Sequence, residues 1–240
     1  MPITIQSGIT IGPAIIVGDA AIQTTSINEY LTSTAYTGSG TTWTATNGTN
    51  ATLVNAPTYT STGANFFSFA PASFQYATVP NPGSLSRWTV EVWLRVTSSL
   101  TGQVTSAVTG AYDLISNLNF SIGTNNSPTS YNLVAGFFDG SWHNTSGFAP
   151  TLNTWYHVVG TYDGSAVTQY VNGVVNSTLN YVGTPASGGE IRIARRWDSA
   201  NNDSTNFFPG DIAVVRIYSV ALTAAQIFTQ YVLEKNRFSI

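Results

Sequence analysis

Short runs of β-forming residues, separated by turn residues at close intervals, dominate this chain from residue 28 onward. The clearest run is Trp88 to Val96, in which polar and apolar residues alternate with the period of two that a strand requires. Many short strands joined by close turns favour a sandwich or a barrel. Further strands are predicted at residues 65–69, 74–79, 131–138, 155–162, 167–171, 191–194 and 211–218.

Local signals predict two hairpins and one helix. The dipeptides Asp163-Gly164 and Asn172-Gly173 each separate two strand-like runs, and such dipeptides adopt the left-handed conformations that tight hairpin turns need. Near the C-terminus, Thr223 is followed three residues later by Gln226, which is the pattern of a capping box. Leu222 is a candidate hydrophobic staple before this cap. Apolar residues at helical spacing follow it: Ala224, Ile227, Phe228 and Tyr231.

Composition excludes several classes of function. Charged residues make up 8% of the 240 residues, the net charge is −3 and no basic run occurs, so we expect no nucleic-acid partner. Ser, Thr and Asn together account for 79 residues, which suits strands and turns better than helices. The absence of cysteine excludes disulfides and thiolate chemistry. The longest apolar stretch near the N-terminus, Ala14 to Val17, is too short to span a membrane, so no membrane insertion is expected. No Lys or Arg precedes Arg87, so a cationic export signal is not expected either.

Residues 1–21 form a unit of their own. They contain three six-residue repeats, each with three β-formers followed by three turn-prone residues: Ile3 to Gly8, Ile9 to Ala14 and Ile15 to Ala20. Three such repeats are too few to bury their own apolar face. One interpretation is an arm that pairs with another subunit or a partner's sheet edge, and the other is an edge strand on its own domain. We divide the chain into this N-terminal β-arm, 1–21, and a globular domain, 22–240.

Four stretches of the globular domain, in order along residues 28–235, form a recognisable pattern: Gly40 to Tyr59, Trp88 to Trp93, Trp155 to Gly173 and Gly210 to Ile227. Together they resemble the laminin-G-like domains of the concanavalin A-like lectin/glucanase superfamily. The resemblance implies an all-β, two-sheet antiparallel jelly-roll sandwich with one short C-terminal helix. The Gly-Thr-Thr-Trp opening and the hexad repeats are similar to modules of bacteriophage structural proteins. One fold hosts many activities, so the resemblance is specific for the fold and weak for function.

Two departures from the family bear on calcium. The acids that often follow the strand matched by Phe66 to Phe69 are replaced by Ala70 to Ser73. The Asp-Glu pair of the closing strand falls on Ala213 and Val214. Calcium prefers several oxygen ligands that include carboxylates. We therefore expect no cofactor; calcium is the one candidate, and the missing acids argue against it.

Catalysis is not expected. Glycoside hydrolysis needs two carboxylates close together on one face, whereas Glu29, Glu91, Glu190 and Glu234 stand alone in the sequence. His157 falls in a strand where the family has a structural histidine, which implies a core or hydrogen-bonding role. No Gly-x-Ser-x-Gly nucleophile elbow occurs.

Two predicted loops are candidates for glycan contact, because sugar sites combine an aromatic platform with planar polar groups that bind hydroxyls. The first runs from Asp139 to Asn144, with Trp142 as the platform and His143 at the loop tip; a solvated turn is the plain alternative. The second runs from Arg195 to Asp203, and it could instead be a polar connection whose Trp covers the sandwich end. The candidate residues are Asp139, Trp142, His143, Asn144, Arg196, Trp197, Asp198, Asn201 and Asn202.

Trp88 and Trp93 have opposite parity on one strand, so they should face opposite sides. Trp88 shares its side with apolar residues and is predicted to face the core. Trp93 lies on the side of Glu91 and Arg95, which predicts a concave outer face or a covering loop, where a ligand or a neighbouring subunit binds.

The resulting hypothesis is a non-enzymatic structural protein on the outside of a phage particle, in the capsid or the tail. It would bind other virion proteins through the arm, assemble as a homo-oligomer and present a lectin-like domain to host-surface carbohydrate. A free-standing bacterial carbohydrate-binding or adhesion module is the alternative, and a glycoside hydrolase is third.

Overall fold

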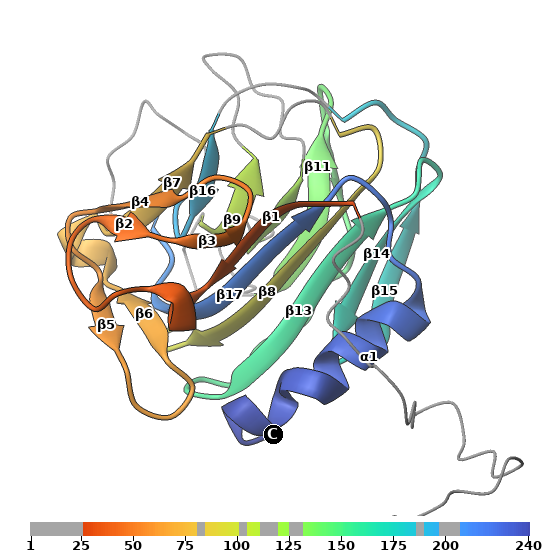
Figure 1. Cartoon of the computed structure of the whole chain (residues 1–240). Coiled ribbons are helices and arrows are strands. Elements are labelled where there is room, and N and C mark those ends of the chain that lie inside the picture. The colour runs from red at the N-terminus through yellow and green to blue at the C-terminus, as the bar shows by residue number, and fades with distance from the viewer. Residues whose placement is uncertain are drawn as a thin grey trace, which may run out of the picture.

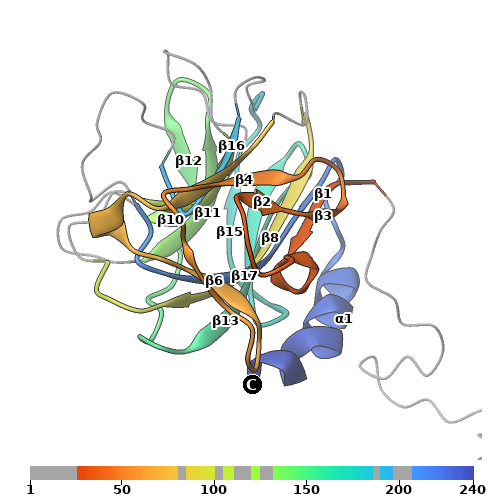
Figure 2. The same ribbon diagram turned by 60° about the vertical axis from the view of Figure 1, so that its left-hand side comes forward.

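The protein is a sandwich of two antiparallel β-sheets with one helix on its outer surface (Figures 1 and 2). The structure, a computed structural model, describes residues 26–80, 85–100, 105–110, 120–124, 132–185, 190–196 and 207–240. The architecture confirms the predicted all-β jelly-roll class with a short C-terminal helix. The arm, residues 1–21, lies outside the described residues, so the division of the chain at residue 21 stays a prediction.

Sheet A contains β8 and β17, the two longest strands of the described chain, at its centre. Its main order is β15-β14-β13-β8-β17-β1-β3, while β6 pairs with β17 and β5 with β6. Its strands are β1 (Ile27–Thr32), β3 (Ala45–Asn47), β5 (Thr58–Thr60), β6 (Phe66–Phe69), β8 (Trp88–Val96), β13 (Trp155–Tyr162), β14 (Ala166–Val171), β15 (Val174–Asn180) and β17 (Gly210–Tyr218).

Sheet B faces sheet A in the order β12-β11-β10-β9-β16-β7-β4-β2. Its strands are β2 (Thr42–Trp43), β4 (Ala51–Val54), β7 (Tyr76–Val79), β9 (Ser106–Gly110), β10 (Ser121–Thr124), β11 (Leu133–Phe138), β12 (Trp142–Asn144) and β16 (Ile191–Ile193). The helices of the described chain are α1 (Ala224–Glu234) and the short 3-10 helices η1 (Ser33–Ala35), η2 (Pro71–Ser73) and η4 (Lys235–Phe238). Among these, none combines the length and the apolarity that crossing a bilayer requires.

The core lies between the sheets and follows from strand alternation. Trp88 and the apolar residues of its parity on β8 are fully buried in the inter-sheet cluster, as predicted. The sheets come very close at Gly160 of β13, where an added Cβ would lie 2.8 Å from Ala135 Cβ and 3.3 Å from Trp88 Cζ3. A glycine is therefore needed at this point of closest packing.

The predicted hairpins and helix are present. Asn172 and Gly173 both have positive φ, 51° and 79°, and they join β14 to β15. The Asp163-Gly164 turn joins β13 to β14. The side chain of Thr223 accepts the Gln226 amide, and the Gln226 side chain accepts the Thr223 amide, which completes the capping box of α1.

The prediction that Trp93 faces an open binding surface is wrong. Trp93 is fully buried, because α1 and η4 cover the outer face of sheet A at this point. Its ring stacks on Phe238 with centroids 4.0 Å apart, and its Nε1 donates to Glu234 at 2.9 Å. Glu91, on the same side, is fully buried with it, and Arg95 is partly buried and paired with Asp211, so their polarity did not indicate an open face.

Candidate functional site

An exposed tryptophan stands at one edge of sheet B, on the hairpin that joins β11 to β12. Phe138 and Trp142 are paired across this hairpin, so their rings share a face and meet edge to face with centroids 5.3 Å apart. Trp142 is 41% exposed. The Asp139 amide donates to the Ser141 carbonyl at 3.3 Å and closes the turn. The first predicted loop therefore displays an indole ring on a short, hydrogen-bonded hairpin.

His143 does not lie at the loop tip, and that expectation is wrong. It belongs to β12 and pairs with Phe137, whose side chain lies in the inter-sheet core. Since successive residues of a strand point to opposite faces, His143 turns away from Trp142. Its ring stacks on Tyr181 with centroids 3.4 Å apart, and its Nε2 lies 2.7 Å from Asp139 Oδ1. On the face of the hairpin opposite Trp142, His143 thus forms a brace with Asp139 and Tyr181.

Asp139 completes this brace. Its second carboxylate oxygen accepts a hydrogen bond from the Tyr181 hydroxyl at 3.0 Å. Burial, together with this hydrogen bond, raises the pKa of Tyr181, so the phenol stays protonated and keeps donating. Both carboxylate oxygens of Asp139 are thus engaged by side chains from β12 and from the segment after β15.

Asn144 is the fourth predicted residue of this loop. It pairs with Gly136, and its Oδ1 would lie 2.1 Å from a Cβ added there, so the glycine makes room for the amide. This oxygen is buried and accepts no hydrogen bond within the described chain. Asn144 therefore lies on the same face of the hairpin as Trp142, packed over Gly136, whereas the Trp142 ring is more exposed.

The second predicted loop begins beside the first. Arg196 Cζ lies 6.0 Å from the centroid of a Trp142 ring, within the range of a cation–π contact. Arg192 Nη1 donates to the Arg196 carbonyl at 3.4 Å, which ties this segment to β16. The structure thus brings the two predicted loops together at one point. Trp197, Asp198, Asn201 and Asn202 lie outside the described residues.

The neighbour of Arg196 has a role that sequence reasoning missed. The guanidinium of Arg195 lies over the rings of both Tyr76 and Phe207, with its Cζ 4.8 and 5.1 Å from their centroids. Phe74 meets Phe207 edge to face at 5.3 Å. The only signal in the sequence was the density of charged and aromatic residues after position 194, because Phe74 and Tyr76 are more than a hundred positions from Arg195.

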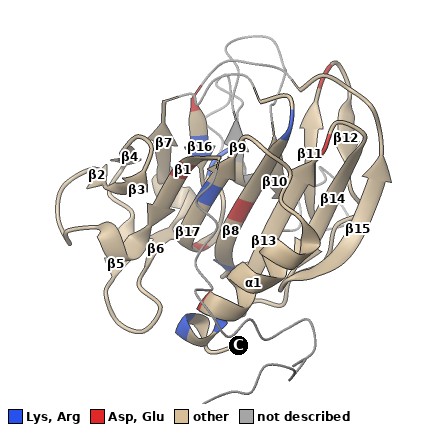
Figure 3. Ribbon diagram, turned by 45° about the vertical axis from the view of Figure 1, so that its right-hand side comes forward, with Lys and Arg blue, Asp and Glu red and all other residues tan. Residues whose placement is uncertain are grey.

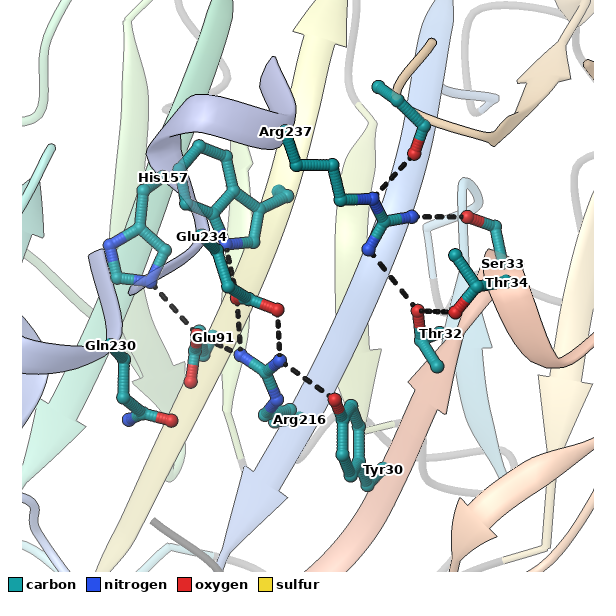
Figure 4. Close-up of polar contacts among 12 residues, drawn as sticks. Tyr30, Thr32, Ser33, Thr34, Glu91, His157, Arg216, Gln230, Glu234 and Arg237 are labelled. Atoms are coloured by element: carbon teal, nitrogen blue, oxygen red, sulfur yellow. Dashed lines mark hydrogen bonds and ion pairs between the residues drawn. The ribbon is translucent and has the colours of Figure 1, made fainter. Parts of the chain in front are cut away.

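The carboxylates of sheet A form a buried cluster. Arg216 binds Glu91 from β8 and Glu234 from α1, and His157 Nε2 lies 2.9 Å from Glu91 Oε1 (Figure 4). Burial alone would raise the pKa of Glu91, but the charge of Arg216 and the His157 hydrogen bond hold it below its usual value. The sequence indicated that Glu91 stands alone, but in the structure it binds Arg216 and His157. The structural role predicted for His157 is confirmed, since its side chain is fully buried.

This cluster is closed to substrate. The side chains of Glu91, Arg216 and His157 have no exposed surface, and Glu234 is 13% exposed. Glycoside hydrolysis needs two carboxylates on either side of a bound sugar, whereas these two hold one guanidinium beneath a helix. Within the described ranges, no group of three or more His, Asp or Glu side chains is placed to hold a metal ion.

Comparison with known families agrees with this architecture. A family model described as the concanavalin A-like lectin/glucanases superfamily (Laminin_G_3) matches residues 71–228. No curated protein matches the chain.

Solved structures with the same fold come from several kinds of protein. Domain 4 of AbnA, a GH43 extracellular arabinanase from Geobacillus stearothermophilus solved with arabinotriose, superposes with a TM-score of 0.64 at 16% identity, covering 84% of this chain and 96% of that one. The binding domain of Paraclostridial Mosquitocidal Protein 1 gives 0.63 at 15% identity, covering 86% and 52%. A Trypanosoma rangeli sialidase gives 0.62 at 14% identity, covering 92% and 34%, so this chain spans about a third of the sialidase. At these identities the similarity shows the fold alone.

Proposed function

Because the chain belongs to the Laminin_G_3 family of concanavalin A-like lectin/glucanase domains, we propose that it is a non-enzymatic glycan-recognition module on the surface of a bacteriophage particle. The fold is a carbohydrate-binding one, of the lectin/glucanase kind. The site that we assign to recognition is the Trp142 rim, which consists of Phe138, Trp142 and Arg196 with its brace of Asp139, His143 and Tyr181.

The observation that carries the proposal is the exposed Trp142 ring beside Arg196. An aromatic face stacks on the apolar face of a sugar ring, and a planar guanidinium donates to hydroxyls in a fixed geometry. Aromatic and Arg side chains are also the residues that most often dominate binding energy. The brace behind the hairpin keeps the indole in place before the ligand arrives, which lowers the entropic cost of binding.

The non-enzymatic part rests on the carboxylates. At the rim, Asp139 has both oxygens bound to His143 and Tyr181, so it lacks the free face that a nucleophile or general base requires. Glu91 and Glu234 both bind Arg216 between sheet A and α1, with Glu91 fully buried. A glycoside hydrolase therefore ranks third among our candidate functions.

The phage assignment rests on the hexad repeats of residues 1–21 and on the similarity of the domain opening to phage modules. In this proposal the arm binds other virion proteins, the subunits form a homo-oligomer and the sandwich points outward. A free-standing bacterial carbohydrate-binding or adhesion module is the second candidate. It would use the same rim without a particle.

Glycan-array binding tests the rim directly. We expect the intact chain to bind at least one host-surface glycan, and Trp142→Ala to weaken that binding about tenfold or more, as loss of an aromatic anchor does. Leu233→Ala is a suitable control, because Leu233 is similarly exposed, at 40%, but lies on α1. Equal binding by all three proteins would overturn the assignment of the rim.

Mass spectrometry of purified virions tests the location. The proposal expects the chain in intact particles at a stoichiometry set by capsid or tail symmetry. Its absence from particles, together with glycan binding by the free protein, would favour the adhesion module instead.

A further inference from the structure

A second aromatic site lies where β4 ends and β7 begins, on the other side of the Arg195-Arg196 pair. It is a cavity of about 400 Å³, which is within the range of small-ligand pockets. Its walls come from β4, from β7 with the residues before it, and from the short bridge that pairs Arg195 with Phe207. The lining residues are Val54, Asn55, Phe74, Tyr76, Arg195 and Phe207.

In the aromatic wall of this cavity, one ring is buried and another is partly exposed at the opening. Phe207 is almost fully buried and anchors the other rings, with its centroid 5.3 Å from Phe74 and 6.0 Å from Tyr76. The guanidinium of Arg195 lies against both Tyr76 and Phe207. Phe74 is nevertheless 38% exposed, so an anchored aromatic ring faces the opening.

The backbone around the cavity adopts an unfavourable conformation at several residues. Four non-glycine residues at or beside the lining have left-handed φ values: Asn55 at 57°, Ala56 at 47°, Phe74 at 52° and Ala194 at 64°. For a bulky residue such as Phe, this region is a true outlier. Residues of this kind gather at functional sites, where the surrounding structure maintains them.

The polar groups of the cavity are also positioned in advance. The Asn55 side-chain amide donates to the Phe74 carbonyl at 2.9 Å, which orients its Oδ1 as an acceptor. The Gln75 side chain donates to the Ala56 carbonyl at 2.9 Å and accepts from the Ala70 amide at 2.9 Å, so the two loops are linked.

We propose that this pocket, lined by Phe74, Tyr76 and Asn55, is a sugar-binding subsite that takes a pyranose ring within an oligosaccharide. The apolar face of the ring stacks on the Phe74 and Tyr76 rings, and its hydroxyls bond to Tyr76 Oη and Asn55 Oδ1. This inference rests on the proposed function and extends it. Arg195 contacts this pocket while Arg196 contacts the Trp142 rim, so consecutive residues join two sugar sites. A glycan that reaches both sites binds more tightly than a single sugar.

A second cavity provides an internal control. It also has a volume of about 400 Å³, but no aromatic residue lines it: its walls are Val96, Ser99, Leu100, Ala149, Pro150, Thr151 and Leu152. Volume alone therefore does not distinguish the two cavities, whereas the aromatic wall does.

The decisive variant is Phe74→Gly, because glycine adopts the observed φ without strain and removes the ring. We expect the variant to fold with a melting temperature close to that of the wild type, because relief of the left-handed φ offsets the lost contact with Phe207. Its affinity for the bound glycan should fall about tenfold or more. Asn153→Gly is the matched control, since Asn153 also has a left-handed φ, 60°, but lies beside the other cavity. Leu152→Ala tests that cavity itself. Both controls should bind glycan like the wild type.

The readout is titration of glycans from an array with neutral and carboxylated members, and binding of either class through Phe74 supports the subsite. Tyr76→Phe, which removes only a hydroxyl, should weaken binding by a smaller factor and covers the case in which Phe74→Gly fails to fold. Loss of binding in Trp142→Ala with full binding in Phe74→Gly and Tyr76→Phe would overturn the subsite and leave the proposed function intact. A wild-type chain that binds no glycan would overturn both.

Discussion

Glu29 shows how burial of a single residue can make stability depend on pH. Its side chain is buried on β1, next to Gly48 and the Thr49 amide, which donates to it at 3.1 Å. Burial raises the pKa of Glu29 to about 7, and the hydrogen bond from Thr49 only partly opposes this. The folded protein therefore binds a proton that the unfolded chain releases at lower pH.

The sign of the effect follows by linkage. The stabilisation from protonated Glu29 is complete below pH 4.5 and is lost as the pH rises through 7. Each pKa unit corresponds to about 1.4 kcal/mol, so the ionised form costs at most about 3 kcal/mol at pH 8. We expect Glu29→Gln to be more stable than the wild type at pH 8 and equal to it at pH 4.5. Urea unfolding at both pH values measures this, and a constant difference between the two proteins would contradict it.

The two tryptophans of β8 give a second prediction at the residue scale. Trp88 is buried between the sheets and Trp93 is buried beneath α1, each with no exposed surface. Truncation of a buried Trp costs about 3–5 kcal/mol, so Trp88→Ala and Trp93→Ala should destabilise the fold by similar amounts. Denaturant unfolding compares them directly. A loss below about 1 kcal/mol in Trp93→Ala would show that α1 separates readily from the sheet.

At the scale of the element, α1 is held to sheet A by charge as well as by packing. Arg216 of β17 lies between Glu91 and Glu234. Its Nη2, which binds Glu234, also donates to the Tyr30 hydroxyl at 3.1 Å. Arg237 of η4 donates to the Ala64 carbonyl at 2.6 Å and so fixes the end of the chain. The same face of α1 packs over the hairpin turn at Gly173, where an added Cβ would lie 3.0 Å from Tyr231.

Removing only the Arg216 charge from this cluster should lower the stability more than replacing all three charged residues with apolar ones. Arg216→Met leaves the Glu91 carboxylate buried without its cation, a change that costs about 3–5 kcal/mol. The triple variant Glu91→Leu, Arg216→Met and Glu234→Leu removes all three charges and should lie close to the wild type in stability. Urea unfolding of both proteins tests the comparison. If the triple variant is the less stable of the two, the charges themselves stabilise the docking of α1.

Elements encoded by short-range chemistry were predictable from the sequence. The Asn172-Gly173 turn, the Thr223 capping box and the alternation of β8 each depend on residues within one element, and the structure contains all three. The covering of Trp93 was not predictable, because it depends on α1, more than a hundred positions away. His143 is a different case, because its orientation is set by pairing with Phe137 within one hairpin, and the error lay in placing this short strand in a loop.

At the scale of the whole molecule, charged residues are few, and several of them are buried. Figure 3 shows how sparse Asp, Glu, Lys and Arg are over the ribbon, and that an acidic position on β8 adjoins a basic one on β17. In the part of the chain that the structure describes, five charged residues are buried: Glu29, Glu91, Arg195, Asp211 and Arg216. The low charge that first indicated a β-rich domain with a surface of hydroxyls and amides thus also leaves little electrostatic steering. In our proposal, recognition therefore rests on short-range contacts: aromatic rings at both sugar sites, with the Arg196 guanidinium at the rim and the Asn55 amide in the pocket.

The last prediction concerns assembly. The described sandwich has its own inter-sheet core, and its first strand, β1, is already paired on both sides by β17 and β3. Removing residues 1–21 takes away none of these contacts, whereas the hexad repeats cannot bury their apolar face alone. We therefore expect the truncated chain, 22–240, to keep its melting temperature and its glycan binding but to lose incorporation into particles. Calorimetry, glycan titration and in vitro assembly with the other virion proteins measure the three properties separately. Normal assembly of the truncated chain would assign attachment to the sandwich instead, and loss of its fold would show that the repeats are an edge strand of the domain.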